Sequence, residues 1–198
     1  MKFIKTAILA GSLLFATSLF AKEIVFIDDK VQDYTLLLKG LSKSSTYYIL
    51  DSKEEGMVQI ASRLKNAKDV DALHIISHGN SGELYLGNST LSANTLPNYT
   101  AELESIRDAL SIDADILLYG CKVAKGEKGD AFVEKFSALT GADVAASSDM
   151  TGSTALGGNW SLEKKTGIMT ATQAISVQAR RAYDGLLVLP TNGVNDIT

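Results

Sequence analysis

Two residues capable of nucleophilic chemistry each follow a short apolar run in the middle of the chain. Residues 70–77 precede His78, and residues 114–119 precede Gly120 and Cys121, the only cysteine of the chain. A thiol is mostly protonated at neutral pH, and a nearby imidazole can take its proton to give a nucleophilic thiolate. Because an imidazole titrates near physiological pH, His78 is the candidate general base for Cys121.

The two apolar runs indicate how these residues are positioned. Short apolar runs bounded by glycine are typical of buried strands in a parallel sheet. Catalytic groups in such sheets gather at the carboxyl ends of the strands. If the two strands are neighbours, His78 and Cys121 therefore arrive at the same edge.

The rest of the chain alternates expected strands and helices. The remaining strands are expected at residues 23–28, 46–51, 142–146 and 160–164, with a small hairpin or edge strand in 83–91. Helices are expected at 31–41, 57–64, 99–110 and 130–139, and a weaker pattern allows one over 170–184. This order favours a mainly parallel sheet with helices on both faces.

The two ends of the chain are predicted to lie outside the fold. Lys2 and Lys5 precede apolar residues 7–15, and small residues follow up to Ala21. This pattern is typical of a signal peptide over 1–21, and it predicts export to the periplasm, cell surface or outside. The alternative is an uncleaved anchor, although the apolar stretch is short for a membrane span. We expect one domain over 22–190, no span after cleavage, and a disordered tail over 191–198.

Composition limits the partners of the chain. The formal net charge of -4 provides no electrostatic basis for binding nucleic acid.

In an exported protein, a lone Cys121 indicates a reactive thiol or an intermolecular bridge, and the alternative is a small buried hydrophobe. His74 is interpreted as a core histidine, because a pair with His78 lacks the further ligands of a zinc site. No metal and no cofactor is predicted.

Three motifs carry a resemblance to a known family. They are His-Ile-Ile-Ser-His-Gly at 74–79, Leu-Leu-Tyr-Gly-Cys at 117–121 and Gly-Ala-Asp-Val-Ala-Ala-Ser-Ser-Asp at 141–149. Over residues 23–167 the chain resembles an uncharacterised bacterial domain found near the amino end of large repeat-containing surface proteins. The first two motifs also resemble the caspase, gingipain, clostripain and legumain group of cysteine peptidases. The resemblance implies a caspase-like three-layer α/β sandwich.

The same resemblance implies roles for individual residues. His78 would be the general base and acid, Cys121 the nucleophile, and the backbone N–H groups of Gly79 and Cys121 the oxyanion donors. Asp149 would bind a basic side chain before the scissile bond, and its alternative is a turn-forming aspartate. The chain departs from many active members at Tyr119, where an acidic or small polar residue is common.

Two functions from different classes follow. The first is a secreted cysteine peptidase or self-processing protease domain, with a protein or peptide as substrate. The second is a non-catalytic surface module that keeps a peptidase-like fold and binds a cell-surface partner in assembly or adhesion. The retained pair of His78 and Cys121 favours the first function, whereas the surface-protein context that the resemblance implies favours the second.

Overall fold

The computed structural model of the chain describes residues 21–189, and the description excludes 1–20 and 190–198. The predicted signal peptide, except for Ala21, and the predicted tail therefore lie outside the described residues. The centre of the fold is a six-stranded sheet in the order β2-β1-β3-β7-β8-β9. Its strands are β1 (Glu23–Asp28), β2 (Thr46–Leu50), β3 (Val70–Ile76), β7 (Leu110–Tyr119), β8 (Asp143–Ala146) and β9 (Lys164–Lys165).

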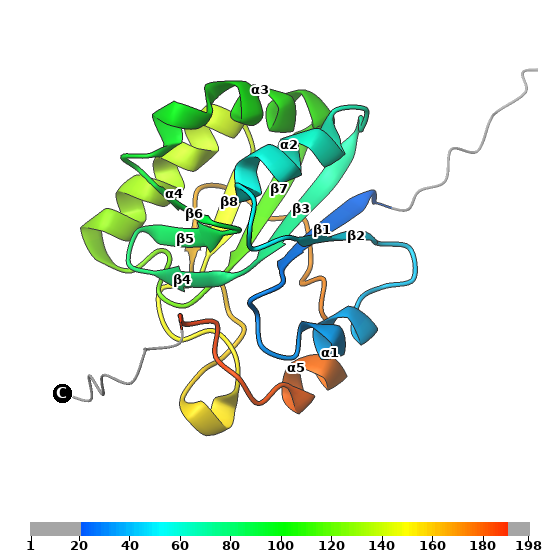
Figure 1. Ribbon diagram of the computed structural model, residues 1–198, viewed down its shortest axis with the longest axis vertical. Coiled ribbons are helices and arrows are strands. Elements are labelled where there is room, and N and C mark those ends of the chain that lie inside the picture. Colours follow the sequence, from blue (N-terminus) through cyan, green and yellow to red (C-terminus); the bar gives the residue numbers. More distant parts are fainter. Residues whose placement is uncertain (1–20, 190–198) are drawn as a thin grey trace, which may run out of the picture.

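Helices cover both faces of this sheet (Figure 1). One face carries α2 (Gly56–Leu64), α3 (Thr100–Ala109) and α4 (Gly126–Thr140), and the other carries α1 (Tyr34–Lys39) and α5 (Val177–Ala182). Two short 3-10 helices lie at Leu96–Tyr99 and Thr154–Leu156. All strand pairs are parallel except the last, in which β9 runs antiparallel to β8. The prediction of an α/β fold with a mainly parallel sheet is confirmed.

The core is divided into two layers by the alternation of side chains along the strands. Phe26 packs in the layer beneath α2, α3 and α4, whereas its neighbours Val25 and Ile27 belong to the layer beneath α1 and α5. Successive side chains of a strand point to opposite faces, so a strand buried on both faces needs apolar residues at every position. This requirement explains the mainly apolar runs, such as residues 24–27, that are visible in the sequence.

A second, smaller sheet follows β3. It contains β4 (His78–Asn80), β5 (Glu83–Leu86) and β6 (Ser89–Ser92), which pair antiparallel in that order. The hairpin expected within 83–91 is thus present as β5 and β6. His78 does not end the long strand, because it begins this small sheet.

Several predicted boundaries differ from those in the structure. Helix α4 begins at Gly126 instead of residue 130, because Gly129 permits close packing of its first turn. A Cβ at Gly129 would lie 2.2 Å from the carbonyl carbon of Ala124. The strand expected at 160–164 is reduced to β9, and the helix expected at 170–184 is reduced to α5.

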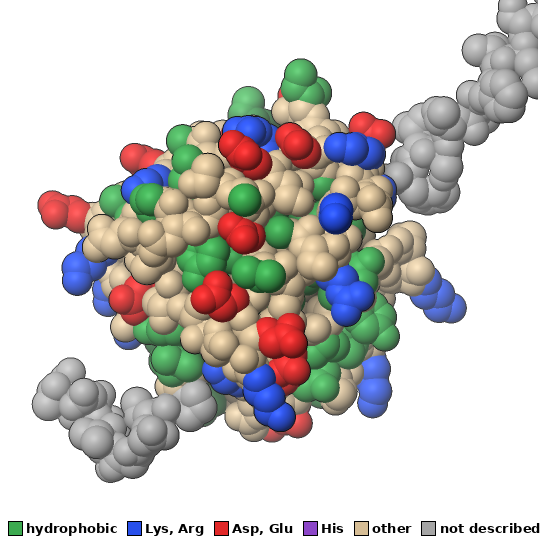
Figure 2. Space-filling model, turned by 45° about the horizontal axis from the view of Figure 1, so that its top comes forward, with side chains coloured by type: hydrophobic (Ala, Val, Ile, Leu, Met, Phe, Trp, Pro, Cys, Tyr) green, Lys and Arg blue, Asp and Glu red, His purple; other side chains and the backbone are tan. Residues whose placement is uncertain are grey.

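The surface over α2 and α3 mixes acidic and basic side chains without a block of one sign (Figure 2). This distribution agrees with the small net charge of -4. Within residues 21–189, every helix is too short or too polar to cross a bilayer.

Candidate active site

The strands that precede His78 and Cys121 are neighbours in the large sheet. β3 and β7 run parallel, with Ile76 paired to Tyr119. Beyond that pair, the backbone N–H of Ser77 donates to the carbonyl oxygen of Tyr119 at 2.9 Å. The predicted meeting of the two motifs at one sheet edge is confirmed, and it lies at the carboxyl ends of the strands.

The imidazole of His78 is buried and oriented by a backbone carbonyl. The residue is 3% exposed, and its Nε2 lies 3.0 Å from the carbonyl oxygen of Lys30. Because a carbonyl oxygen only accepts hydrogen bonds, Nε2 carries the proton of the neutral ring and Nδ1 keeps its lone pair. Nδ1 is buried without a hydrogen-bond partner among residues 21–189. This nitrogen is therefore the one free to accept a proton.

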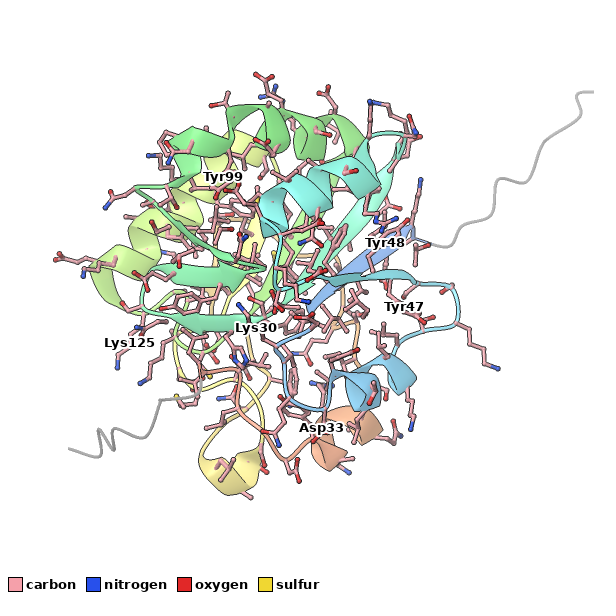
Figure 3. The ribbon with its side chains drawn as sticks, in the orientation of Figure 1. Lys30, Asp33, Tyr47, Tyr48, Tyr99 and Lys125 are labelled. Atoms are coloured by element: carbon pink, nitrogen blue, oxygen red, sulfur yellow. The ribbon has the colours of Figure 1, made fainter. Side chains whose placement is uncertain are left out.

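The carbonyl of Lys30 is fixed by the turn after β1. One carboxylate oxygen of Asp28 accepts from the Lys30 N–H at 3.0 Å, and the other accepts from the Gly87 N–H at 2.6 Å. The Lys30 ammonium donates to the Gly87 carbonyl at 2.9 Å. Lys30 thus lies where the end of β1 meets the small sheet (Figure 3). Burial raises the pKa of the Asp28 carboxyl, while the two N–H groups and the Lys30 charge oppose that change.

The thiol of Cys121 is enclosed. The residue is 0% exposed, the N–H of Thr151 donates to Sγ at 3.3 Å, and the thiol donates to the Thr151 carbonyl at 3.5 Å. Burial raises the pKa of the thiol, and the backbone N–H groups of Thr151 and Leu187 oppose that change. Within the described part of the chain, no hydrogen bond joins this thiol to the ring of His78.

Two backbone N–H groups converge on one carbonyl oxygen beside the thiol. The N–H of Gly79 and the N–H of Cys121 each lie 3.0 Å from the carbonyl oxygen of Leu187. These are the two donors that the resemblance implies for an oxyanion. The structure brings them together and places a peptide carbonyl of the chain itself between them.

Glycine at position 79 permits this convergence. A Cβ there would lie 2.6 Å from Cγ2 of Val123 and 3.0 Å from the carbonyl oxygen of Cys121. Any side chain would therefore push β4 away from the cysteine loop. The residue after the cysteine, Lys122, adopts a left-handed conformation with φ of 62°, and its N–H donates to the Asp149 carbonyl at 2.6 Å. Such backbone strain in a residue other than glycine is concentrated at functional sites.

Asp149 lies on the surface after β8. Its carboxylate accepts from Nδ2 of Asn159 at 2.8 Å and from Oγ of Ser147 at 3.3 Å. These contacts suit a residue that orders a turn, and they leave carboxylate lone pairs for a further donor. Its role in binding a basic side chain stays a prediction.

His74 lies in the core, as predicted. It is 0% exposed, its ring stacks on Tyr119 with centroids 6.1 Å apart, and Nδ1 lies 3.4 Å from the Tyr119 hydroxyl. Burial lowers its pKa to about 4, although the Asp115 carboxylate acts in the opposite direction. Within residues 21–189, no three His, Cys, Asp or Glu side chains are grouped so as to hold a metal ion.

Sequence reasoning missed three residues of the site: Lys30, Thr151 and Leu187. Each acts through backbone atoms, so its side-chain type provides no chemical signal. The apolar run at 186–189 is the only pattern in the sequence that indicates a buried segment after α5.

Comparisons with known proteins place the chain in a family without a described activity. A search of curated proteins finds no match. A solved structure described as a small-chain dehydrogenase is 8% identical over 61% of this chain and 70% of that chain, with a TM-score of 0.27. A similarity this weak carries no argument about fold or activity. A family model described as a domain of unknown function matches residues 24–187, which is most of the chain and ends at Leu187. The chain therefore belongs to the DUF4347 family.

Proposed function

We propose that the chain is a cysteine peptidase in which Cys121 is the nucleophile and His78 is the general base and acid. The observation that carries the proposal is the convergence of the Gly79 and Cys121 N–H groups on one carbonyl oxygen. Acyl transfer develops negative charge on that oxygen, and preorganised N–H donors stabilise it in a site that excludes water.

The tautomer of His78 supports the same role. With Nε2 donating to Lys30, the unpaired Nδ1 is the ring atom that can take the thiol proton and later deliver it to a leaving amine. Thr151 contacts both the thiol and the N–H of Leu187, so the nucleophile and the carbonyl that binds the oxyanion donors lie in the same part of the fold. In this arrangement the thiol is held by the backbone of Thr151, so its hydrogen bond to His78 must form before the reaction.

The sheet supports the caspase-like sandwich that the resemblance implies. Five parallel strands in the order β2-β1-β3-β7-β8 are followed by the antiparallel β9, and the candidate dyad lies at the carboxyl ends of the central pair. Export through the predicted signal peptide belongs to the same proposal, since it places a reactive thiol where no second cysteine of the chain can pair with it.

A non-catalytic surface module is the second candidate. The observation that favours it is the resting state of Cys121, which is fully buried, hydrogen-bonded to Thr151 and raised in pKa by burial. A structural thiol inherited from a peptidase ancestor has these same properties. The two candidates therefore differ in whether the thiol becomes reactive once its cover is removed.

Opening the site tests the peptidase proposal. Leu187 is 0% exposed, so Leu187→Asp places a charge in an apolar site and displaces the covering segment. Leu189→Asp is the matched control, because Leu189 is 36% exposed. We expect the Leu187→Asp protein to hydrolyse members of a peptide library, and expect Cys121→Ala or His78→Ala in that background to abolish hydrolysis. A folded Leu187→Asp protein that cleaves no peptide would favour the surface module.

Alkylation by iodoacetamide gives an independent measurement. Because the raised pKa leaves less thiolate at pH 7 than in a free cysteine, the unmodified chain should react slowly. Leu187→Asp should accelerate the reaction by roughly tenfold or more, because it restores both access and solvation of the thiolate. Leu189→Asp should react at the rate of the unmodified chain. Equal rates in all three proteins would show that the segment containing Leu187 does not cover the thiol.

A further inference from the structure

The segment 185–187 is seated beside the candidate dyad as an added strand. It runs antiparallel to 151–153 and is held through main-chain contacts. These are Leu187 N–H to Thr151 O at 2.9 Å, Ser153 N–H to Gly185 O at 2.8 Å, and a bridge between Gly152 and Leu186. Extended peptides bind proteins in this way, with backbone hydrogen bonds giving affinity and alternate side chains entering pockets. The segment therefore occupies the place of a substrate.

The carbonyl oxygen of Leu187 lies where the resemblance implies the oxyanion of a substrate. It accepts the two N–H donors at 3.0 Å, and the Leu187 side chain is buried in the same apolar cluster as Cys121 and Tyr183. The next two residues, Val188 and Leu189, are 38% and 36% exposed, so the chain reaches the surface directly after this carbonyl. Figure 1 shows the segment returning from α5 to the edge beneath β4. The peptide bond between Leu187 and Val188 thus lies at the border between the site and solvent.

We propose that the chain cleaves its own peptide bond between Leu187 and Val188. This inference rests on the proposed peptidase function and names the first substrate of that site, which is an extended segment with an apolar leucine before the scissile bond.

The reaction is balanced with water as the second reactant. Nδ1 of His78 takes the proton of the Cys121 thiol, and the sulfur attacks the Leu187 carbonyl carbon to form a C–S bond. The negative charge on the carbonyl oxygen is held by the N–H groups of Gly79 and Cys121. When the C–N bond to Val188 breaks, His78 returns the proton to the leaving amine. Water then hydrolyses the thioester, leaving a carboxylate on Leu187 and a thiol on Cys121.

The resting thiol must change partners before it can attack. Its hydrogen bonds to Thr151 at 3.3 and 3.5 Å hold the sulfur on the backbone of that residue. Cleavage therefore requires loss of the Thr151 contacts, and ionisation of a thiol whose pKa burial raises. We expect a slow, first-order reaction that accelerates as the pH rises above neutrality.

Incubation of the purified full chain at pH 8 tests the proposal. Mass spectrometry and amino-terminal sequencing should detect a fragment that begins at Val188, released at a rate independent of protein concentration. The fragment should be absent from Cys121→Ala and His78→Ala proteins. Leu187→Asp should reduce its release at least tenfold, whereas Leu187→Met should retain it, because methionine fills the same apolar volume.

The outcomes separate this proposal from the function on which it rests. If the chain stays intact while the Leu187→Asp protein hydrolyses peptides through Cys121, self-cleavage is overturned and the peptidase stands. If the chain stays intact and no variant hydrolyses a peptide, both proposals are overturned. Release of the Val188 fragment from Cys121→Ala would also overturn self-cleavage, because another agent would then be making the cut.

Discussion

The ring of His78 is hydrogen-bonded to the carbonyl of Lys30 at 3.0 Å, across 48 positions of sequence. The orientation of the candidate base is thus set by the turn after β1, far from both catalytic motifs. Substitution of Lys30 removes the contact of its ammonium with Gly87 but keeps its carbonyl, so the turn is better probed through the group that accepts from the Lys30 N–H. That group is the carboxylate of Asp28, which uses both oxygens.

Asp28→Asn should misplace the His78 ring without unfolding the protein. An amide has one acceptor oxygen, so either the Lys30 or the Gly87 N–H loses its partner. We expect peptide hydrolysis by the Leu187→Asp protein to slow by roughly tenfold, since small misplacements of a catalytic group lower rates strongly. Asp29→Asn, at the exposed neighbour, should leave the rate unchanged.

A positioning role for Asp28 predicts non-additivity with His78. In a His78→Ala background, Asp28→Asn should slow alkylation of Cys121 no further, because the ring through which it acts is gone. An equal effect of Asp28→Asn in both backgrounds would show that this carboxylate only stabilises the fold.

Gly79→Ala should remove oxyanion stabilisation. The added Cβ meets Val123 at 2.6 Å and Cys121 at 3.0 Å, so β4 must shift and carry its N–H away from the carbonyl. Gly157→Ala is the control, because its Cβ meets no atom within 4 Å and its φ of 79° makes alanine strained. Both substitutions should lower the free energy of unfolding by about 1 kcal/mol or more.

Peptide hydrolysis distinguishes these two alanine variants. Loss of one oxyanion donor lowers turnover by roughly 100-fold, and we expect that loss only in Gly79→Ala. If Gly79→Ala hydrolyses peptides as fast as Gly157→Ala, the Gly79 N–H takes no part in the reaction.

His74 makes the stability of the fold sensitive to acid. Its pKa is lowered from 6.5 to about 4 by burial, so between these values the unfolded chain binds a proton that the folded chain excludes. Stability contributed by neutral His74 is present above pH 6.5 and is lost as the pH falls toward 4. By pH 5 this loss amounts to about 2 kcal/mol.

Urea unfolding of the parent and His74→Gln proteins at pH 7.5 and pH 5 measures this contribution. Glutamine does not titrate, so the free energy of unfolding of the variant should fall less between the two pH values. An identical fall in both proteins would place the acid sensitivity elsewhere in the chain.

The sequence carries enough local information to predict the mainly parallel sheet and the neighbouring strands that precede His78 and Cys121. Residues 23–28 form β1 with the predicted bounds, and the mainly apolar runs before His78 and Cys121 form neighbouring strands. The strand pairing that places Leu187 between two N–H donors has no such signature. It depends on backbone atoms of segments far apart in the chain, and local periodicity does not record those contacts.

Long-range contacts also decide the position of Trp160, which the sequence assigns to an expected strand at 160–164. Its carbonyl accepts instead from the Gln173 amide, and its side chain is buried between the sheet and α5 with Tyr183. A large aromatic side chain that fills the core decides the path of this segment more strongly than β propensity does.

The predicted role of Asp149 in substrate selection can be separated by experiment from its role in the turn. Leu187 shows that the chain presents an apolar side chain before the candidate scissile bond, whereas the resemblance implies a basic one. If the free lone pairs of the Asp149 carboxylate bind Arg or Lys, they do so through charge-assisted hydrogen bonds that an amide makes more weakly.

Paired peptides with Leu or Arg before the cut, assayed with the Leu187→Asp protein, measure this contribution. Asp149→Asn should lower the ratio of Arg to Leu cleavage by roughly tenfold, because one charge-assisted hydrogen bond is worth about 1.5 kcal/mol or more. Asn keeps one acceptor oxygen and so retains one of the contacts to Asn159 and Ser147, and cleavage after Leu should persist. An unchanged ratio would identify Asp149 as a turn residue and leave the buried leucine as the only specificity element that the chain displays.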